Sequence, residues 1–136
     1  MAEAFSFELV SPEKLLLSDD VEMVVVPGAE GDFGVLVGHA PLISSLRPGV
    51  IDTYNGDKVE KRIFVAGGFA EVTGERCTVL AEEAVPVEDI DASAVEERIK
   101  AANKAISEAD NDTARTAAET ELAVAEAMLA AGHARS

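Results

Sequence analysis

The sequence predicts an α+β protein: an N-terminal antiparallel flattened β-sandwich or barrel, followed by a C-terminal antiparallel two-helix hairpin. In residues 1–86, short β-branched and aromatic runs alternate with turns about every eight residues, as in all-β domains. Beyond Pro86, glycines and β-branched residues thin out and alanines recur at helical spacing. We therefore expect two domains, a sandwich at residues 1–86 and a helical hairpin at residues 87–136.

The first strands are predicted from alternation and from polar breaks. Apolar and polar side chains alternate at residues 5–10, which favours a half-buried strand. A second strand is predicted at residues 14–17 and a third at residues 21–26. Between them, Ser18-Asp19-Asp20 has the composition of a polar turn.

A glycine-rich stretch follows the third strand. Pro27-Gly28 is expected to end that strand, because proline lacks the N–H that a sheet requires. Gly31 and Gly34 bracket Asp32-Phe33, which predicts a tight turn with these two side chains pointing outward from its tip.

The rest of the predicted sandwich consists of short strands and turns. Residues 35–37 are apolar enough for a strand, and Pro41 excludes a helix directly after it. Residues 49–54 and 58–65 flank Asn55-Gly56, a strong hairpin signal. Later turns at Gly67-Gly68 and Gly74-Glu75 separate strands predicted at residues 69–73 and 77–81.

Two helices are predicted after the boundary. Asp91 or Ser93 can cap the first helix, and Asp112 can cap the second, which Gly132 is expected to end. Their predicted apolar faces are Val95, Ile99, Ala102 and Ile106 in the first helix, and Ala114, Ala118, Leu122, Ala125 and Leu129 in the second. The short link makes the helices antiparallel.

Charge and composition limit the possible functions. The net charge of −15 argues against nucleic-acid binding, because a binder needs clustered Lys and Arg. It also argues against direct attraction to anionic lipid. The N-terminal sequence lacks the basic region of a secretion signal, and no apolar run is long enough to span a bilayer, so we expect the protein to be made and kept in the cytoplasm.

No catalytic residue, metal site or cofactor site is predicted. Gly28–Gly34 lacks the Lys and the following helix of a phosphate-binding loop. His39 has no second His or nucleophile near it in sequence, which favours a structural or interface role. Cys77 lies within an apolar strand, which favours a buried structural thiol.

Several motifs in one order resemble a known family. The runs GDFG, GHAPL and RPG, the Gly67-Gly68 turn and the helical tail together resemble the epsilon subunit of bacterial F-type ATP synthases. The resemblance implies a non-catalytic rotor subunit of the central stalk. Such a subunit couples a proton-driven membrane ring to the gamma shaft and to ATP synthesis in the catalytic head. It also implies a peripheral location at the cytoplasmic face of the inner membrane, with membrane contact only through the complex.

The resemblance implies two contact surfaces. In the family, the loop matching the first surface faces the membrane rotor ring, and the second surface faces the stalk, which implies contact with the gamma subunit or the ring. Here the expected ring contacts are Glu30, Gly31, Asp32 and Phe33, and the expected gamma contacts are Gly38, His39, Ala40, Pro41 and Leu42.

Two departures from the family pattern concern regulation. Ile90 and Asp91 match the start of an ATP-binding motif, but Ala94 stands where that motif has Arg, and the missing cation argues against nucleotide binding. In the family a basic second helix can grip the catalytic head and block ATP hydrolysis. The second helix here carries two arginines, Arg115 and Arg135, against three glutamates, Glu119, Glu121 and Glu126. This charge balance predicts that the helix regulates ATP hydrolysis only weakly.

Two alternatives remain open from the residues alone. The chain could be an unrelated β-sandwich ligand-binding module whose helices form a dimerisation hairpin. It could also be an enzyme of unknown type, although no motif in the sequence supports a reaction.

Overall fold

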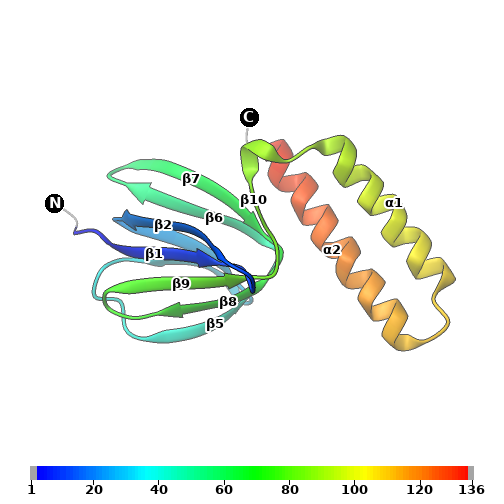
Figure 1. Ribbon diagram of the computed structural model, residues 1–136, viewed down its shortest axis with the longest axis horizontal. Coiled ribbons are helices and arrows are strands. Elements are labelled where there is room, and N and C mark those ends of the chain that lie inside the picture. Colours follow the sequence, from blue (N-terminus) through cyan, green and yellow to red (C-terminus); the bar gives the residue numbers. More distant parts are fainter. Residues whose placement is uncertain (1–2, 135–136) are drawn as a thin grey trace. The chain divides into compact units, whose positions relative to one another are not determined.

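The computed structural model describes residues 3–134, and the chain divides after Pro86 into two compact units. Figure 1 shows strands in the first unit and helices in the second. The predicted fold class, a β-sandwich followed by two helices, is confirmed.

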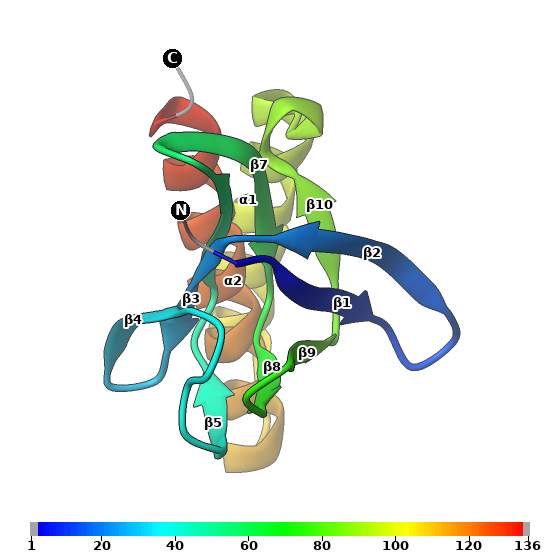
Figure 2. The same ribbon diagram turned by 90° about the vertical axis from the view of Figure 1, so that its left-hand side faces the viewer.

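The strands of the first unit form one curled sheet. Its order is β10-β7-β6-β3-β5-β8-β9-β1-β2, with β4 paired to β3. Figure 2 shows how the sheet folds over on itself, with the β3–β4 hairpin at one side and β1–β2 at the other. The strands are β1 (Phe5–Val10), β2 (Leu15–Val21), β3 (Met23–Gly28), β4 (Gly31–Val35), β5 (Leu42–Leu46), β6 (Gly49–Asn55), β7 (Lys58–Val65), β8 (Gly68–Val72), β9 (Arg76–Ala81) and β10 (Ala84–Pro86).

Two details of the predicted strands are wrong. Ser18-Asp19-Asp20 is not a turn but part of β2, where Asp19 pairs with Phe7 of β1. Asp19 is tolerated there because the Lys61 ammonium of β7 lies 2.6 Å from its carboxylate. No separate strand forms at residues 35–37: Val35 is the last residue of β4, and Leu36 and Val37 are exposed beyond it.

The pairing of the strands also differs from the prediction. β1 runs parallel to β9, with Phe7 beside Cys77, so the sandwich is not wholly antiparallel. The short strand β10 was not predicted, and it pairs with β7. Pairings between strands so distant in sequence leave no local signal, which explains both misses.

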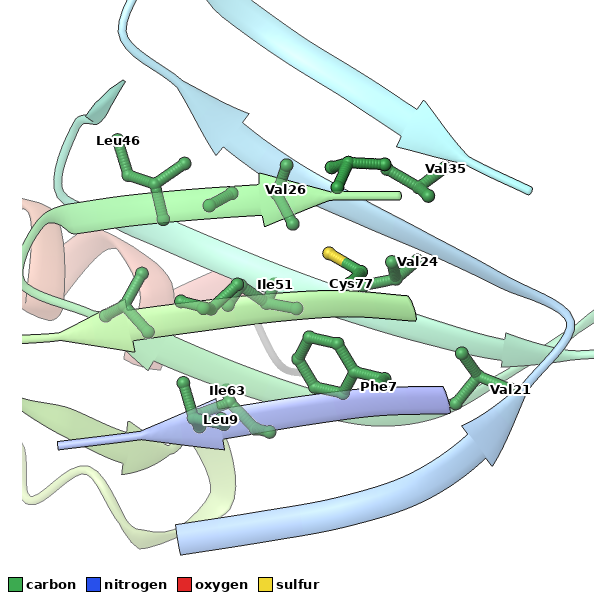
Figure 3. Close-up of a cluster of buried hydrophobic side chains, with 14 of the residues drawn as sticks. Phe7, Leu9, Val21, Val24, Val26, Val35, Leu46, Ile51, Ile63 and Cys77 are labelled. Carbon is green, nitrogen blue, oxygen red and sulfur yellow. The ribbon is translucent and has the colours of Figure 1, made fainter. Parts of the chain in front are cut away.

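The core lies between the two layers of the curled sheet. Figure 3 shows side chains from both layers pointing toward one another, including Phe7, Ile51, Val24 and Cys77. Phe7 and Ile51 are completely buried. Branched and aromatic side chains pack well at the inward positions of alternating strands, which is why these residues form this sandwich.

The second unit contains η1 (Val87–Asp89), α1 (Ala92–Glu108) and α2 (Asp112–Ala134). Asp91 caps α1, as predicted, by accepting hydrogen bonds from the backbone N–H groups of Ser93 and Ala94. Ser93 lies inside the helix and is not the cap. The cap of α2 is Asn111, whose Oδ1 accepts from the N–H of Ala114 at 2.8 Å, and not Asp112.

Two further predictions for the helices need correction. Gly132 does not end α2, which continues to Ala134. A side-chain carbon at Gly132 would lie 3.0 Å from Cγ2 of Ile90, so this glycine lets α2 pass close to Ile90. The predicted apolar faces are confirmed in part, because four of their residues are buried: Val95, Ala102, Ala118 and Ala125. Ala114 is exposed instead. The buried face of α2 also includes Val124, Met128 and Ala131.

A charge pair joins the two helices. Nε and one terminal nitrogen of Arg98 on α1 donate to Oε1 of Glu121 on α2, at 3.0 and 2.7 Å. The same guanidinium lies 3.9 Å from the sulfur of Met128. Arg98 therefore holds the antiparallel helices together where their alanine-rich faces bury little apolar area.

Phe7 and Phe69 are a matched pair for testing the core. Phe7→Ala should lower the free energy of unfolding by about 3–5 kcal/mol, because it leaves a cavity in a close-packed interior. Phe7 is completely buried, whereas the Phe69 side chain is 55% exposed. Phe69→Ala should therefore change stability by about 0.5 kcal/mol or less. Urea unfolding followed by the fluorescence of Tyr54, the single tyrosine, reports on the sandwich. Equal losses in the two variants would contradict this core.

Candidate functional site

The turn between β3 and β4 is tighter than predicted. The strands pair from Val24 opposite Val35 to Gly28 opposite Gly31, so Ala29-Glu30 forms the tip. Pro27 and Gly28 remain in β3, and they do not end it before the turn. A side-chain carbon at Gly28 would lie 3.0 Å from the Phe33 ring, so the ring packs directly on this glycine.

The expected ring-contact residues consequently have different environments. Glu30 is exposed at the tip, and Gly31 has a positive φ of 146°. Asp32 lies in β4, where its carboxylate is 2.5 Å from a guanidinium nitrogen of Arg47. Phe33 is half-buried and packs against the core, so its predicted outward position at the tip is wrong. The prediction that Gly31 and Gly34 bracket the tip is wrong, because Gly34 lies within β4, and sequence reasoning did not include Arg47.

The Gly38–Leu42 segment forms a second exposed surface. The N–H of Gly38 donates to the carbonyl of Gly74 at 2.8 Å, which ties this loop to the β8–β9 turn. Nδ1 of His39 donates to the carbonyl of Ala40 at 2.7 Å. Pro41 and Leu42 are exposed where β5 begins. The predicted ring-contact stretch therefore covers the tip and the first three residues of β4, and the Gly38–Leu42 segment follows the end of β4.

A row of apolar side chains, exposed except at the half-buried Val10, crosses the outer face of the sheet, and sequence reasoning missed it. Register places Phe69 of β8 beside Leu80 of β9, Leu80 beside Val10 of β1, and Val10 beside Leu15 of β2. Ile43, on β5, is 70% exposed and lies on the same face. We call Phe69, Leu80, Val10, Leu15 and Ile43 the apolar row. The sequence signal that could have revealed the row is the apolar residues at the outward-pointing positions of these strands, which are normally polar.

Asp52 occupies a partly buried position on the outer face of β6. Its Oδ1 lies 3.6 Å from Nε of Arg62, the cross-strand neighbour on β7. Burial raises the pKa of Asp52, the Arg62 charge opposes that rise, and the Asp32 charge adds to it. Asp52 therefore couples electrostatically to the β3–β4 hairpin.

The remaining candidate residues have structural roles. Cys77 is buried, as predicted, and burial raises the pKa of its thiol to about 12, so it is not a reactive nucleophile. Ile90 packs against α2 and Asp91 caps α1. Among residues 3–134, no group of three His, Cys, Asp or Glu side chains could hold a metal ion. Arg135 lies outside the described residues.

Comparison with known proteins identifies the family. Residues 4–87 match the family described as ATP synthase, Delta/Epsilon chain, beta-sandwich domain. The chain belongs to this family. The ATP synthase epsilon chain of Rhodospirillum rubrum is 58% identical over 96% of this chain and 98% of its own length. That of Paramagnetospirillum magneticum is 59% identical with the same coverage.

Solved structures of mitochondrial ATP synthases contain chains with the same fold. A chain of the Euglena gracilis mitochondrial ATP synthase superposes with a TM-score of 0.79 at 27% identity, over 96% of this chain and 82% of its own. A chain from the central stalk and c-ring structure of the Tetrahymena thermophila mitochondrial ATP synthase superposes with a TM-score of 0.72 at 15% identity, over 96% of this chain and 98% of its own. At that identity the match shows the shared fold alone. Neither helix in the described part of this epsilon-family chain is long and apolar enough to cross a bilayer.

The raised pKa of Asp52 gives a pH-dependent prediction. The folded chain binds the Asp52 proton more tightly than the unfolded chain, so this group stabilises the fold at low pH. That stability is lost as the pH rises above 3.8, the ordinary value. Asp52→Asn stays neutral and should therefore raise the melting temperature at pH 7, with the gain disappearing well below pH 3.8.

Calorimetry at both pH values checks this prediction for Asp52. Asp57→Asn removes a carboxylate from the exposed β6–β7 turn and is the matched control. A melting temperature of Asp52→Asn that is unchanged or lower at pH 7 would show that the Arg62 attraction outweighs burial.

Proposed function

We propose that the chain is a non-catalytic rotor subunit in the central stalk of a proton-translocating F-type ATP synthase. In this role it couples rotation of the membrane ring to the gamma subunit, and through gamma to ATP synthesis in the catalytic head. Membership of the epsilon family supports the assignment. The structural observation that carries it is the apolar row, an unusual surface for a chain with a net charge of −15.

The apolar row is proposed as the gamma-facing surface. The row begins at Ile43, one residue after the Gly38–Leu42 segment, and crosses four further strands, whereas Leu42 pairs with the buried Val72 and points to the other face of β5. Burying exposed aromatic and branched side chains drives association at about 25 cal/mol per Å². A rigid sheet also suits a part that must carry load, because close-packed interiors deform little.

The tip of the β3–β4 hairpin is proposed as the ring-facing surface. Glu30 is exposed there and carries a negative charge, whereas the Asp32 carboxylate is paired with Arg47. An acidic tip fits a partner loop that carries basic groups. The subunit would then sit at the cytoplasmic face of the bacterial inner membrane and touch the membrane only through the complex.

The helical hairpin is proposed as a weak regulator of ATP hydrolysis. α2 carries Glu119 and Glu126 on exposed positions, which would repel an acidic segment of the catalytic head. Arg98 already binds Glu121 within the hairpin, which favours the folded form. Ile90 and Asp91 have structural partners and the motif Arg is absent, so we assign no nucleotide site.

Charges placed in the apolar row should weaken gamma binding. Phe69→Glu and Leu80→Glu should each raise the Kd for purified gamma subunit by at least about 30-fold, the effect of losing a central hot spot worth about 2 kcal/mol. Both side chains are exposed, so the fold should survive. Thr116→Glu adds the same charge to an exposed position of α2 and should leave Kd unchanged. Unchanged affinity for gamma in both Phe69→Glu and Leu80→Glu would show that the gamma subunit does not bind the apolar row.

Reversing charge on α2 should strengthen inhibition. With Glu119→Lys and Glu126→Lys combined, two new surface pairs of about 0.5 kcal/mol each should lower ATP hydrolysis by the assembled enzyme about fivefold. The matched control, Glu119→Gln with Glu126→Gln, removes repulsion without adding attraction and should have a smaller effect. Identical hydrolysis in the Lys variant and the native enzyme would contradict electrostatic control of the hairpin.

A further inference from the structure

The turn between β5 and β6 is fastened to the β3–β4 hairpin by Arg47. One terminal nitrogen of its guanidinium donates to the carbonyl of Gly28 at 2.6 Å, and the other donates to the carboxylate of Asp32 at 2.5 Å. Gly28 ends β3 and Asp32 lies in β4, so a single side chain bridges both strands of the hairpin. In Figure 2 this hairpin lies at one side of the sandwich.

Backbone contacts close the same junction. The N–H of Arg47 donates to the carbonyl of Pro27 at 3.0 Å, and the N–H of Ala29 donates to the carbonyl of Ser45 at 2.9 Å. A side-chain carbon at Gly49 would lie 2.8 Å from Cβ of Pro27, so the β5–β6 turn is packed directly against β3. The base of the hairpin, including the Ala29 N–H, is thus fixed, and the side chains of Ala29 and Glu30 are exposed at the tip.

We propose that Arg47 is a positioning residue, which holds the Ala29-Glu30 tip in the orientation that meets the rotor ring. Asp32 then acts through Arg47 and does not contact the ring itself. This inference rests on the proposed ring-facing role of the tip. It divides the predicted contact stretch into a part that touches, Glu30, and parts that orient it, Asp32 and Phe33.

The chemistry of the junction calls for arginine. A planar guanidinium presents several N–H donors in a fixed fork, so it can bind a carbonyl and a carboxylate at once. A lysine ammonium at the same position can reach one acceptor well but lacks that fork. Arg47→Lys should therefore keep part of the clamp, whereas Arg47→Met should lose it.

Mobility of the tip tests the clamp directly. A nitroxide attached at Glu30→Cys in the full chain reports local motion, and Cys77 stays unlabelled because its thiol is buried with a pKa of about 12. Arg47→Met and Asp32→Asn should shorten the rotational correlation time of the label, and Arg47→Lys should lie between them and the parent. Arg115→Met removes the same charge from α2 and should match the parent. An unchanged label in Arg47→Met would overturn the clamp.

Coupling in the assembled enzyme tests the positioning role, with Glu30 left in place. Protons pumped per ATP hydrolysed in vesicles should fall in Arg47→Met, and Arg47→Lys should restore part of the loss. A mobile tip with unchanged coupling would overturn the positioning role. Full coupling in Glu30→Ala would overturn the ring contact at the tip and, with it, the positioning role of Arg47. The nitroxide measurement would still show whether Arg47 restrains the tip.

Discussion

One curled sheet that encloses its own apolar core is the constraint on which the rest of the structure depends. Strands from both ends of the first unit must face the same interior, so Phe7 of β1 lies in one cluster with Ile51 of β6 and Val24 of β3. The Lys61–Asp19 pair joins β7 to β2, strands near opposite ends of the sheet path. Because a slip by one residue would turn every core side chain outward, the core fixes the register of each strand.

The fixed register also decides what the outer surface presents. When Ala70 and Val79 point inward, Phe69 and Leu80 must point outward and meet across the strands. The apolar row is therefore a direct consequence of the same alternation that builds the core. Likewise, Gly28 can lie under the Phe33 ring only when β3 and β4 pair as they do, which leaves Ala29-Glu30 as the tip.

Local patterns in the sequence predicted much of this fold, and long-range contacts account for the misses. The β6–β7 hairpin and the Asp91 cap depend on neighbouring residues and were predicted. Asp19 was misread as a turn residue because its partner, Lys61, is distant in sequence. Arg47 was part of a recognised motif, yet its role depends on Gly28 and Asp32 across a junction that no local pattern reveals. Likewise, no local pattern reveals that Gly132 lies against Ile90, so the sequence wrongly predicted a helix end at this glycine.

In the proposed role the sandwich transmits rotation and the helical hairpin only adjusts ATP hydrolysis. ATP-driven proton pumping tests this division most directly. The enzyme would be assembled in vesicles with residues 1–86 in place of the full chain. The core cluster lies wholly within that range, so the shortened chain should fold and pump as many protons per ATP as the full chain does. Continued ATP hydrolysis with pumping abolished would contradict this account.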